Sequence, residues 1–136
     1  MVGMRFPLLL PCTLLFLVLA GCTVSPSSNP ELVGSWRDYS APETSRSLEL
    51  HGDGTWEFGS SSGTWTVQSI DDSDWESWGV DPYGPTRKIV LYGWNGDVAD
   101  GPIEESNRVD FIWVIYYVDL GAGPRQVQLK FGRWNP

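Results

Sequence analysis

The chain has 136 residues, of which 17 are Asp or Glu, 9 are Lys or Arg and 1 is His, so its formal net charge is -8. This length is enough for one domain. The acidic balance excludes a protein that binds the phosphate backbone of nucleic acids. All 8 Trp and all 5 Tyr follow residue 21, and side chains of that size bury enough area to form a core. The sequence therefore predicts a folded acidic domain without a nucleic-acid partner.

The first 21 residues have the pattern of an export signal. Arg5 precedes an apolar run from Phe6 to Ala20. This run is shorter than the ~20 residues that cross a bilayer as a helix. A positive charge, a short apolar run and small residues at its end are typical of a secretory signal peptide. We therefore expect residues 1–21 to be a signal peptide.

The signal ends in Leu19-Ala20-Gly21-Cys22, which resembles the lipobox of bacterial lipoproteins. The resemblance implies cleavage before Cys22, a diacylglycerol thioether on its sulfur and acylation of the new amino group, for example with palmitate. Two or more acyl chains anchor a protein durably. The chain is thus expected on the extracytoplasmic face of a bacterial cell membrane, either the plasma or the outer membrane. Ordinary signal cleavage with a free Cys22 thiol and an uncleaved anchor helix are the alternatives.

Residues 22–30 are expected to be a lipidated cysteine followed by a flexible tether, and residues 31–136 a single β domain. The tether is polar and contains Pro26 and Pro30. Removal of Arg5 with the signal leaves 8 basic against 17 acidic residues, a net charge of -9. Anionic headgroups repel such a surface, so the lipid must hold the domain at the membrane. Cys12 leaves with the signal, and no cysteine remains for a disulfide.

From residue 32 onward, polar and apolar residues alternate and glycines mark the turns, which favours antiparallel sheet and no helix. His51 to Gly54 forms one such turn, and Ser60 to Gly63 the next. The expected fold class is all-β, a small antiparallel up-and-down barrel or sandwich of about seven to eight strands. Strands are expected at residues 32–36, 47–51, 55–58, 64–67, 87–92, 109–118 and 125–131.

The segment 109–118 is almost wholly apolar. A strand of this kind is apolar on both faces, and both must be covered. The core covers one face, and a loop, a partner or the membrane is expected to cover the other.

Four segments carry a family resemblance: Leu32–Trp36, Leu48–Leu50, Asp53–Phe58 and Gly63–Val67. Together they look like the small β domains of bacterial lipocalin-like proteins, many of which are lipoproteins. The resemblance implies a barrel in which Trp36 closes one end.

No catalytic residue, metal or cofactor is expected. His51 is the single histidine and stands beside a turn, which is typical of a solvated side chain. A Ser-His-Asp triad has no support in the spacing, and zinc sites need several His or Cys ligands. The acidic run Asp71–Glu76 lacks the EF-hand pattern, because Ser77 stands where glycine is required and Tyr83 where glutamate is required. The pair Glu104-Glu105 is interpreted as part of a solvated Gly-Pro loop.

The segment 71–85 is expected to be a long acidic loop containing Trp75, Trp78 and Tyr83. Loops carry binding residues more often than strands do, and exposed Trp and Tyr are typical anchors for sugar rings or protein partners. These three residues are therefore the predicted ligand-binding site. The alternative is that the two Trp fold back and cap one end of the barrel. Four other tryptophans lie in predicted strands and are assigned to the core: Trp36, Trp56, Trp65 and Trp113.

These observations favour a non-enzymatic, membrane-anchored lipoprotein of the bacterial cell envelope that binds a small apolar ligand or a glycan. Its partners are the membrane, through the lipid on Cys22, and such a ligand or an envelope protein. One alternative is a protein-interaction or inhibitor lipoprotein whose acidic surface meets a basic partner. A small hydrolase is the other.

Overall fold

The computed structural model describes residues 29–40, 46–106 and 108–134. The predicted signal peptide, Cys22 and the tether up to residue 28 lie outside the described residues. Within the described part of the chain, no helix is both long and apolar enough to cross a membrane.

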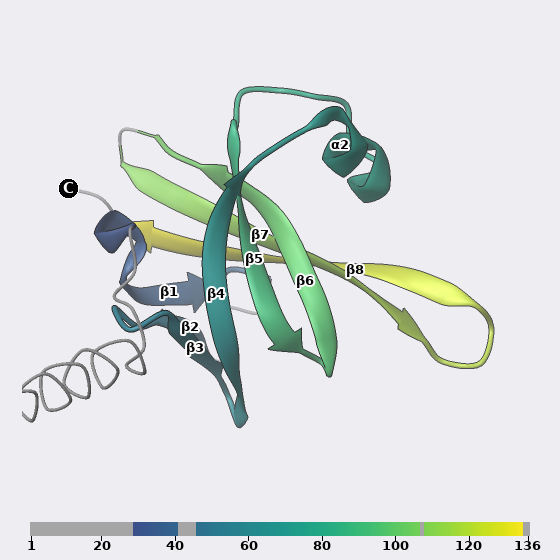
Figure 1. The fold of residues 1–136 in the computed structure, drawn as a ribbon, viewed down its shortest axis with the longest axis horizontal. Coiled ribbons are helices and arrows are strands. Elements are labelled where there is room, and N and C mark those ends of the chain that lie inside the picture. The colour runs from purple at the N-terminus through teal and green to yellow at the C-terminus, as the bar shows by residue number, and fades with distance from the viewer. Residues whose placement is uncertain (1–28, 41–45, 107, 135–136) are drawn as a thin grey trace, which may run out of the picture.

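Eight antiparallel strands form a closed barrel in which each strand pairs with the next along the chain and the last pairs with the first (Figure 1). This arrangement confirms the all-β, up-and-down prediction and selects the barrel over the sandwich. The strands are β1 Gly34–Asp38, β2 Ser47–Leu50, β3 Thr55–Phe58, β4 Ser61–Ser69, β5 Arg87–Trp94, β6 Asp97–Glu104, β7 Val109–Asp119 and β8 Pro124–Trp134.

Strand β6 was not among the expected strands, and the interpretation of Glu104 as a loop residue is wrong, since it is the last residue of β6. The sequence of β6 contains a glycine and a proline and lacks a clear alternation. Proline is normally excluded from paired strands because it cannot donate to the ladder. Here the registered pairs between β6 and β7 pass from Asp100 to Ile103 and skip Gly101 and Pro102. Pro102 is therefore in register with Lys88 of β5 but with no residue of β7.

Two further boundaries differ from the prediction. The segment expected to start the first strand at Leu32 begins with a 3₁₀-helix, η2 (Pro30–Leu32), and β1 starts after it. The turn expected at residues 60–63 ends earlier, because Gly59 takes a positive φ of 62° and β4 already begins at Ser61. A left-handed glycine reverses the chain in fewer residues than the serine run indicated.

The expectation that no helix forms is wrong for the first half of segment 71–85. Residues Asp72–Trp78 form a helix, α2. Asp71 caps its first turn by accepting a hydrogen bond from the Asp74 N–H at 3.0 Å, and the Asp74 carboxylate accepts one from the Asp71 N–H. Gly79 ends the helix in the left-handed region at a φ of 71°. Both ends of α2 thus satisfy backbone groups that a helix leaves unpaired.

The barrel interior is filled by large side chains. Trp36, Trp56 and Phe131 are fully buried, and the Trp56 ring lies 5.0 Å from the ring of Trp94. Trp65 also belongs to this core, so the core assignment is confirmed for three of the four strand tryptophans. These rings fill much of the barrel interior.

Trp36 joins the start of β1 to the end of β8. Its Nε1–H donates to the Leu32 carbonyl in η2 at 2.9 Å, and the Arg133 guanidinium lies 4.2 Å from the ring centre. Arg133 also donates to the Val33 carbonyl at 3.0 Å. The tryptophan therefore lies at the end of the barrel that η2 borders.

The middle of strand β7 is covered on both faces, as its composition predicted, while Tyr117 near its end is 52% exposed. Ile112 and Val114 point into the core, while Trp113 and Ile115 pack in a second cluster with Trp75 and Trp78 of α2. A segment of the same chain thus covers the outer face. The assignment of Trp113 to the core is wrong, because the alternation along β7 places it outside the barrel, under α2.

Candidate functional site

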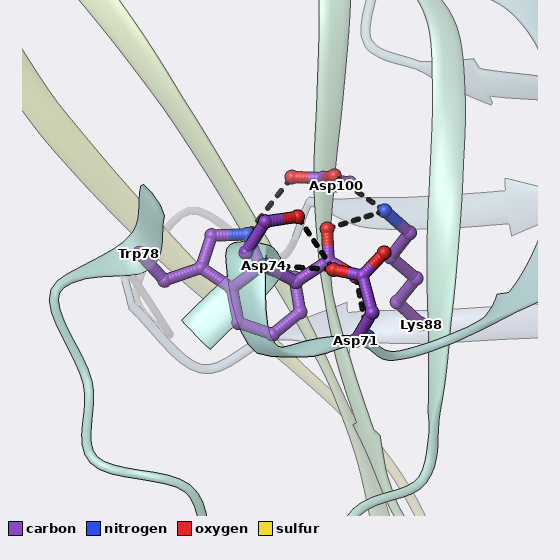
Figure 2. A network of polar contacts seen from close by, with 6 residues as sticks. Asp71, Asp74, Trp78, Lys88 and Asp100 are labelled. Atoms are coloured by element: carbon purple, nitrogen blue, oxygen red, sulfur yellow. Dashed lines mark hydrogen bonds and ion pairs between the residues drawn. The ribbon is translucent and has the colours of Figure 1, made fainter. Parts of the chain in front are cut away.

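Helix α2 is held on the outer wall of the barrel by a polar network centred on Lys88 of β5 (Figure 2). The Lys88 ammonium lies 2.6 Å from an Asp74 carboxylate oxygen and 3.3 Å from one of Asp100 in β6. Burial lowers the pKa of Lys88, but the hydrogen bonds and charges of the two aspartates outweigh it and raise the pKa above its usual value. Lys88 therefore stays charged and ties the helix to two strands.

Asp100 links this network to the aromatic side chains. Its second oxygen accepts a hydrogen bond from Trp78 Nε1–H at 2.9 Å. The Trp78 carbonyl accepts another at 2.9 Å from the side-chain amide of Gln126 in β8. Trp78 is thereby fixed from two sides against the wall.

An apolar pocket of about 180 Å³ opens beside α2. The centre of the Trp75 ring lies 5.3 Å from that of Trp78, in an edge-to-face arrangement, and 5.2 Å from that of Tyr83, in a tilted one. The two tryptophans are 7% and 2% exposed, whereas Tyr83 is 47% exposed and stands at the pocket mouth. The lining consists of Trp75, Trp78, Val80, Tyr83, Pro102, Trp113, Ile115 and Gln128.

Glu104 accepts hydrogen bonds from two of the side chains that line the pocket. One of its carboxylate oxygens accepts from the Tyr83 hydroxyl at 2.5 Å and from Trp113 Nε1–H at 2.6 Å. Burial and the bond to Glu104 raise the pKa of Tyr83, so its phenol is neutral and donates at ordinary pH. The loop after α2 is thus attached to β6 and β7 at one carboxylate.

A more polar hollow of about 360 Å³ adjoins the pocket and shares Tyr83 with it. Glu104, Glu105 and Arg87 border this hollow. The Arg87 guanidinium is already engaged, at 3.0 Å from Glu31 and 3.2 Å from Glu105. The aromatic pocket therefore continues, past Tyr83, into a hollow bordered by the carboxylates of Glu104 and Glu105.

The structure brings the three predicted ligand-binding residues, Trp75, Trp78 and Tyr83, into one pocket. The expectation that Trp75 and Trp78 are exposed is wrong, since both are buried. The alternative in which they fold back onto the barrel is supported in this respect, although they cover the outer wall and not an end. Sequence reasoning missed two partners, Trp113 and Glu104. The outward position of Trp113 followed from its alternation with inward Ile112 and Val114, whereas no local pattern marked Glu104.

The remaining candidates lie apart from this pocket. His51, directly after β2, is half-buried, with its Nε2 at 3.6 Å from a Glu57 oxygen. The acidic run 71–76 lies partly in α2, where its carboxylates cap the helix and bind Lys88. In the part of the chain that the structure describes, no group of three or more His, Cys, Asp or Glu residues is arranged to hold a metal ion.

Fold and site together define a small closed β-barrel with an aromatic pocket on its outer wall. No family model, no curated protein and no solved structure matches this chain.

The attachment of α2 is expected to depend on pH at both extremes. Hydrogen bonds from Ser73 and the Asp74 N–H lower the pKa of Asp71, so its capping contribution is complete above the unfolded value of ~3.9 and is lost as pH falls through the lower folded value. Because the pKa of Lys88 is raised, its contribution to stability changes with pH in the opposite direction. Its contribution is complete below the unfolded value of ~10.4 and is lost as pH rises through the folded value.

Tryptophan fluorescence followed across the pH range measures this dependence. Asp71→Asn keeps a good capping oxygen without a titrating charge and should weaken the acid transition. Lys88→Arg keeps its charge at high pH and should move the alkaline transition upward. Unchanged transitions in both variants would contradict the assignment.

Proposed function

We propose that this protein is a non-enzymatic, lipid-anchored binding module of the bacterial cell envelope that takes a small ligand in the pocket between α2 and the barrel wall. The observation that carries the proposal is the convergence of Trp75, Trp78 and Tyr83 with Trp113 around one apolar pocket. Concave apolar pockets with aromatic walls and few polar groups are the usual form of small-ligand sites.

The sequence supports a position close to the membrane. The lipobox at Cys22 supplies the anchor, and the eight residues from Thr23 to Pro30 span at most about 26 Å. The first described residues lie near the polar hollow, since Arg87 donates to the Asn29 side chain at 3.3 Å and pairs with Glu31. The pocket would therefore work within a short distance of the lipid surface.

The roles of the carboxylates support binding rather than catalysis. Glu104 accepts from two aromatic side chains, and Asp74 and Asp100 share Lys88. A general acid or base needs a proton partner on the substrate side. These three groups are instead used to position rings and a helix.

A protein-interaction lipoprotein is the second candidate, and exposed apolar side chains favour it. The β7–β8 hairpin reaches past the rest of the barrel (Figure 1). Tyr117 and Leu120, near its tip, are 52% and 77% exposed. Exposed apolar residues that cluster on one element are typical of partner contacts.

Two measurements test the proposal. Mass spectrometry of the native amino-terminal peptide should find diacylglyceryl-Cys22, and Cys22→Ser should release the protein from membranes. An unmodified terminus at Met1 or Met4 would refute the anchor. Purification from membranes should then recover a small molecule with the wild-type chain. Tyr83→Ala should lose that molecule and Leu120→Ser should retain it, whereas a protein that is lost only from Leu120→Ser would favour the second candidate.

A further inference from the structure

The polar atoms of three pocket rings are all bonded to carboxylates. Trp78 Nε1–H donates to Asp100 at 2.9 Å, and Trp113 Nε1–H and the Tyr83 hydroxyl donate to Glu104 at 2.6 and 2.5 Å. These donors are no longer available to a ligand. The carbon atoms of the rings line the pocket instead.

Aromatic rings that donate hydrogen bonds to carboxylates attract a positively charged ligand. The face of an aromatic ring is negative and attracts ammonium groups. A carboxylate that accepts a hydrogen bond from the ring N–H or O–H polarises the ring further, and its own charge adds to the negative potential. Two cations beside this site, Lys88 and Arg87, are each paired with two acidic side chains.

A cation of the chain itself already lies against the aromatic rings of this wall. The Lys130 ammonium of β8 lies 5.1 Å from the centre of the Trp113 ring and 4.1 Å from that of Phe111. An ammonium group against Trp113 is thus a contact that this protein makes within its own chain.

The lining fits a sugar poorly. Sugar hydroxyls need hydrogen-bonding groups, and the polar side-chain group that lines the pocket besides Tyr83 and the indoles is the Gln128 amide. Its Nε2 donates to Gln126 at 2.7 Å. Buried hydroxyls without partners would cost binding free energy, whereas methyl groups around a positive nitrogen need none.

We propose that the aromatic pocket binds an alkylated ammonium group, such as a trimethylammonium group, carried by a free small molecule or by a lipid headgroup. The inference rests on the proposed binding function and specifies its ligand class. The rings surround the cation, and Glu104 and Asp100 act through them as charged positioning residues. A neutral apolar group of the same shape would gain the contact area but not the electrostatic attraction.

Choline and its uncharged isostere, in which a tert-butyl group replaces the trimethylammonium group, test the charge. Each is titrated against the full chain in a detergent without quaternary nitrogen, with tryptophan fluorescence as the readout. Choline should bind about tenfold more tightly, as expected for a cation between desolvated rings. Equal or tighter binding of the isostere would overturn the cation while leaving a small-ligand pocket. Absence of binding by both, with no small molecule recovered from membranes, would overturn the proposed function as well.

Two variants separate charge from packing. Glu104→Gln keeps an acceptor for Tyr83 and Trp113 but removes the charge, so choline affinity should fall several-fold and isostere affinity should stay constant. Glu76→Gln removes a charge at an exposed position of α2 that lines neither the pocket nor the hollow, and should leave both affinities unchanged. Equal losses in the two variants would refute a role through the rings. A short-chain phosphatidylcholine that binds more tightly than choline would assign the source to a lipid headgroup, and equal affinities would assign it to a free cation.

Discussion

Replacing Trp36 by alanine is expected to lower the free energy of unfolding by about 3–5 kcal/mol, the range for removing a fully buried large aromatic side chain. The seam between β1 and β8 is short, because its register joins only Arg37 to Gly132 and Asp38 to Phe131. Trp36 reinforces that seam by bonding to Leu32 and by packing under Arg133. Its loss removes core volume and loosens the closure of the barrel together.

Urea unfolding followed by far-UV circular dichroism measures this effect. Trp36→Phe keeps most of the buried ring but loses the bond to Leu32, and should cost clearly less than the alanine variant. Tyr92→Ala, at an exposed position of β5, provides the matched surface control and should change little. A Trp36→Ala protein within about 1 kcal/mol of wild type would contradict the closing role.

The strands that the sequence predicted are those with an unbroken period of two. Residues 125–131 are an example, since Val127, Leu129 and Phe131 alternate with polar residues and form part of β8. Strand β6 was not predicted because Gly101 and Pro102 interrupt the alternation of polar and apolar residues. Its place in the barrel is fixed by pairing with β5 and β7, a tertiary cause that local propensity does not contain.

Helix α2 was not predicted for a different reason. Its 7 residues make barely two turns, too few for a helical period to emerge above the surrounding acids. The capping signal was present but weak, because Asp71 and Asp74 replace the usual Ser or Thr and Glu or Gln of a capping box. The apolar faces of Trp75 and Trp78 supply the stability through packing on the barrel.

The candidate site was predictable in its aromatic half only. Trp75, Trp78 and Tyr83 stood out because polar residues surround them where strand periodicity stops. Glu104 and Trp113 are nine residues apart in the chain and meet because β6 and β7 are neighbours. Their juxtaposition with Tyr83 depends on the pairing of these neighbouring strands, which no spacing in the sequence specifies.

Replacing Trp78 by alanine is expected to release α2 while the barrel stays folded. Removal of a buried tryptophan costs up to about 3–5 kcal/mol. Trp78 also supplies the bond to Asp100, and its cluster with Trp75 and Ile115 is separate from the barrel core. Once α2 has detached, the barrel has lost only the free energy that held the helix on the wall. The free energy of unfolding of the barrel can fall by no more than this amount. The effect should therefore be local, unlike that of Trp36→Ala.

Amide hydrogen exchange resolved by residue distinguishes the two outcomes. In Trp78→Ala, the amides of α2 should lose protection while those of β2, β5 and β8 keep it. Glu76→Ala, an exposed position on the same helix, should leave both groups protected. Released α2 also dismantles the aromatic pocket, so ligand binding should disappear without unfolding of the barrel. Binding that survives with α2 detached would place the ligand site elsewhere and refute the pocket, and protection lost across the strands would show that helix and barrel unfold as one unit.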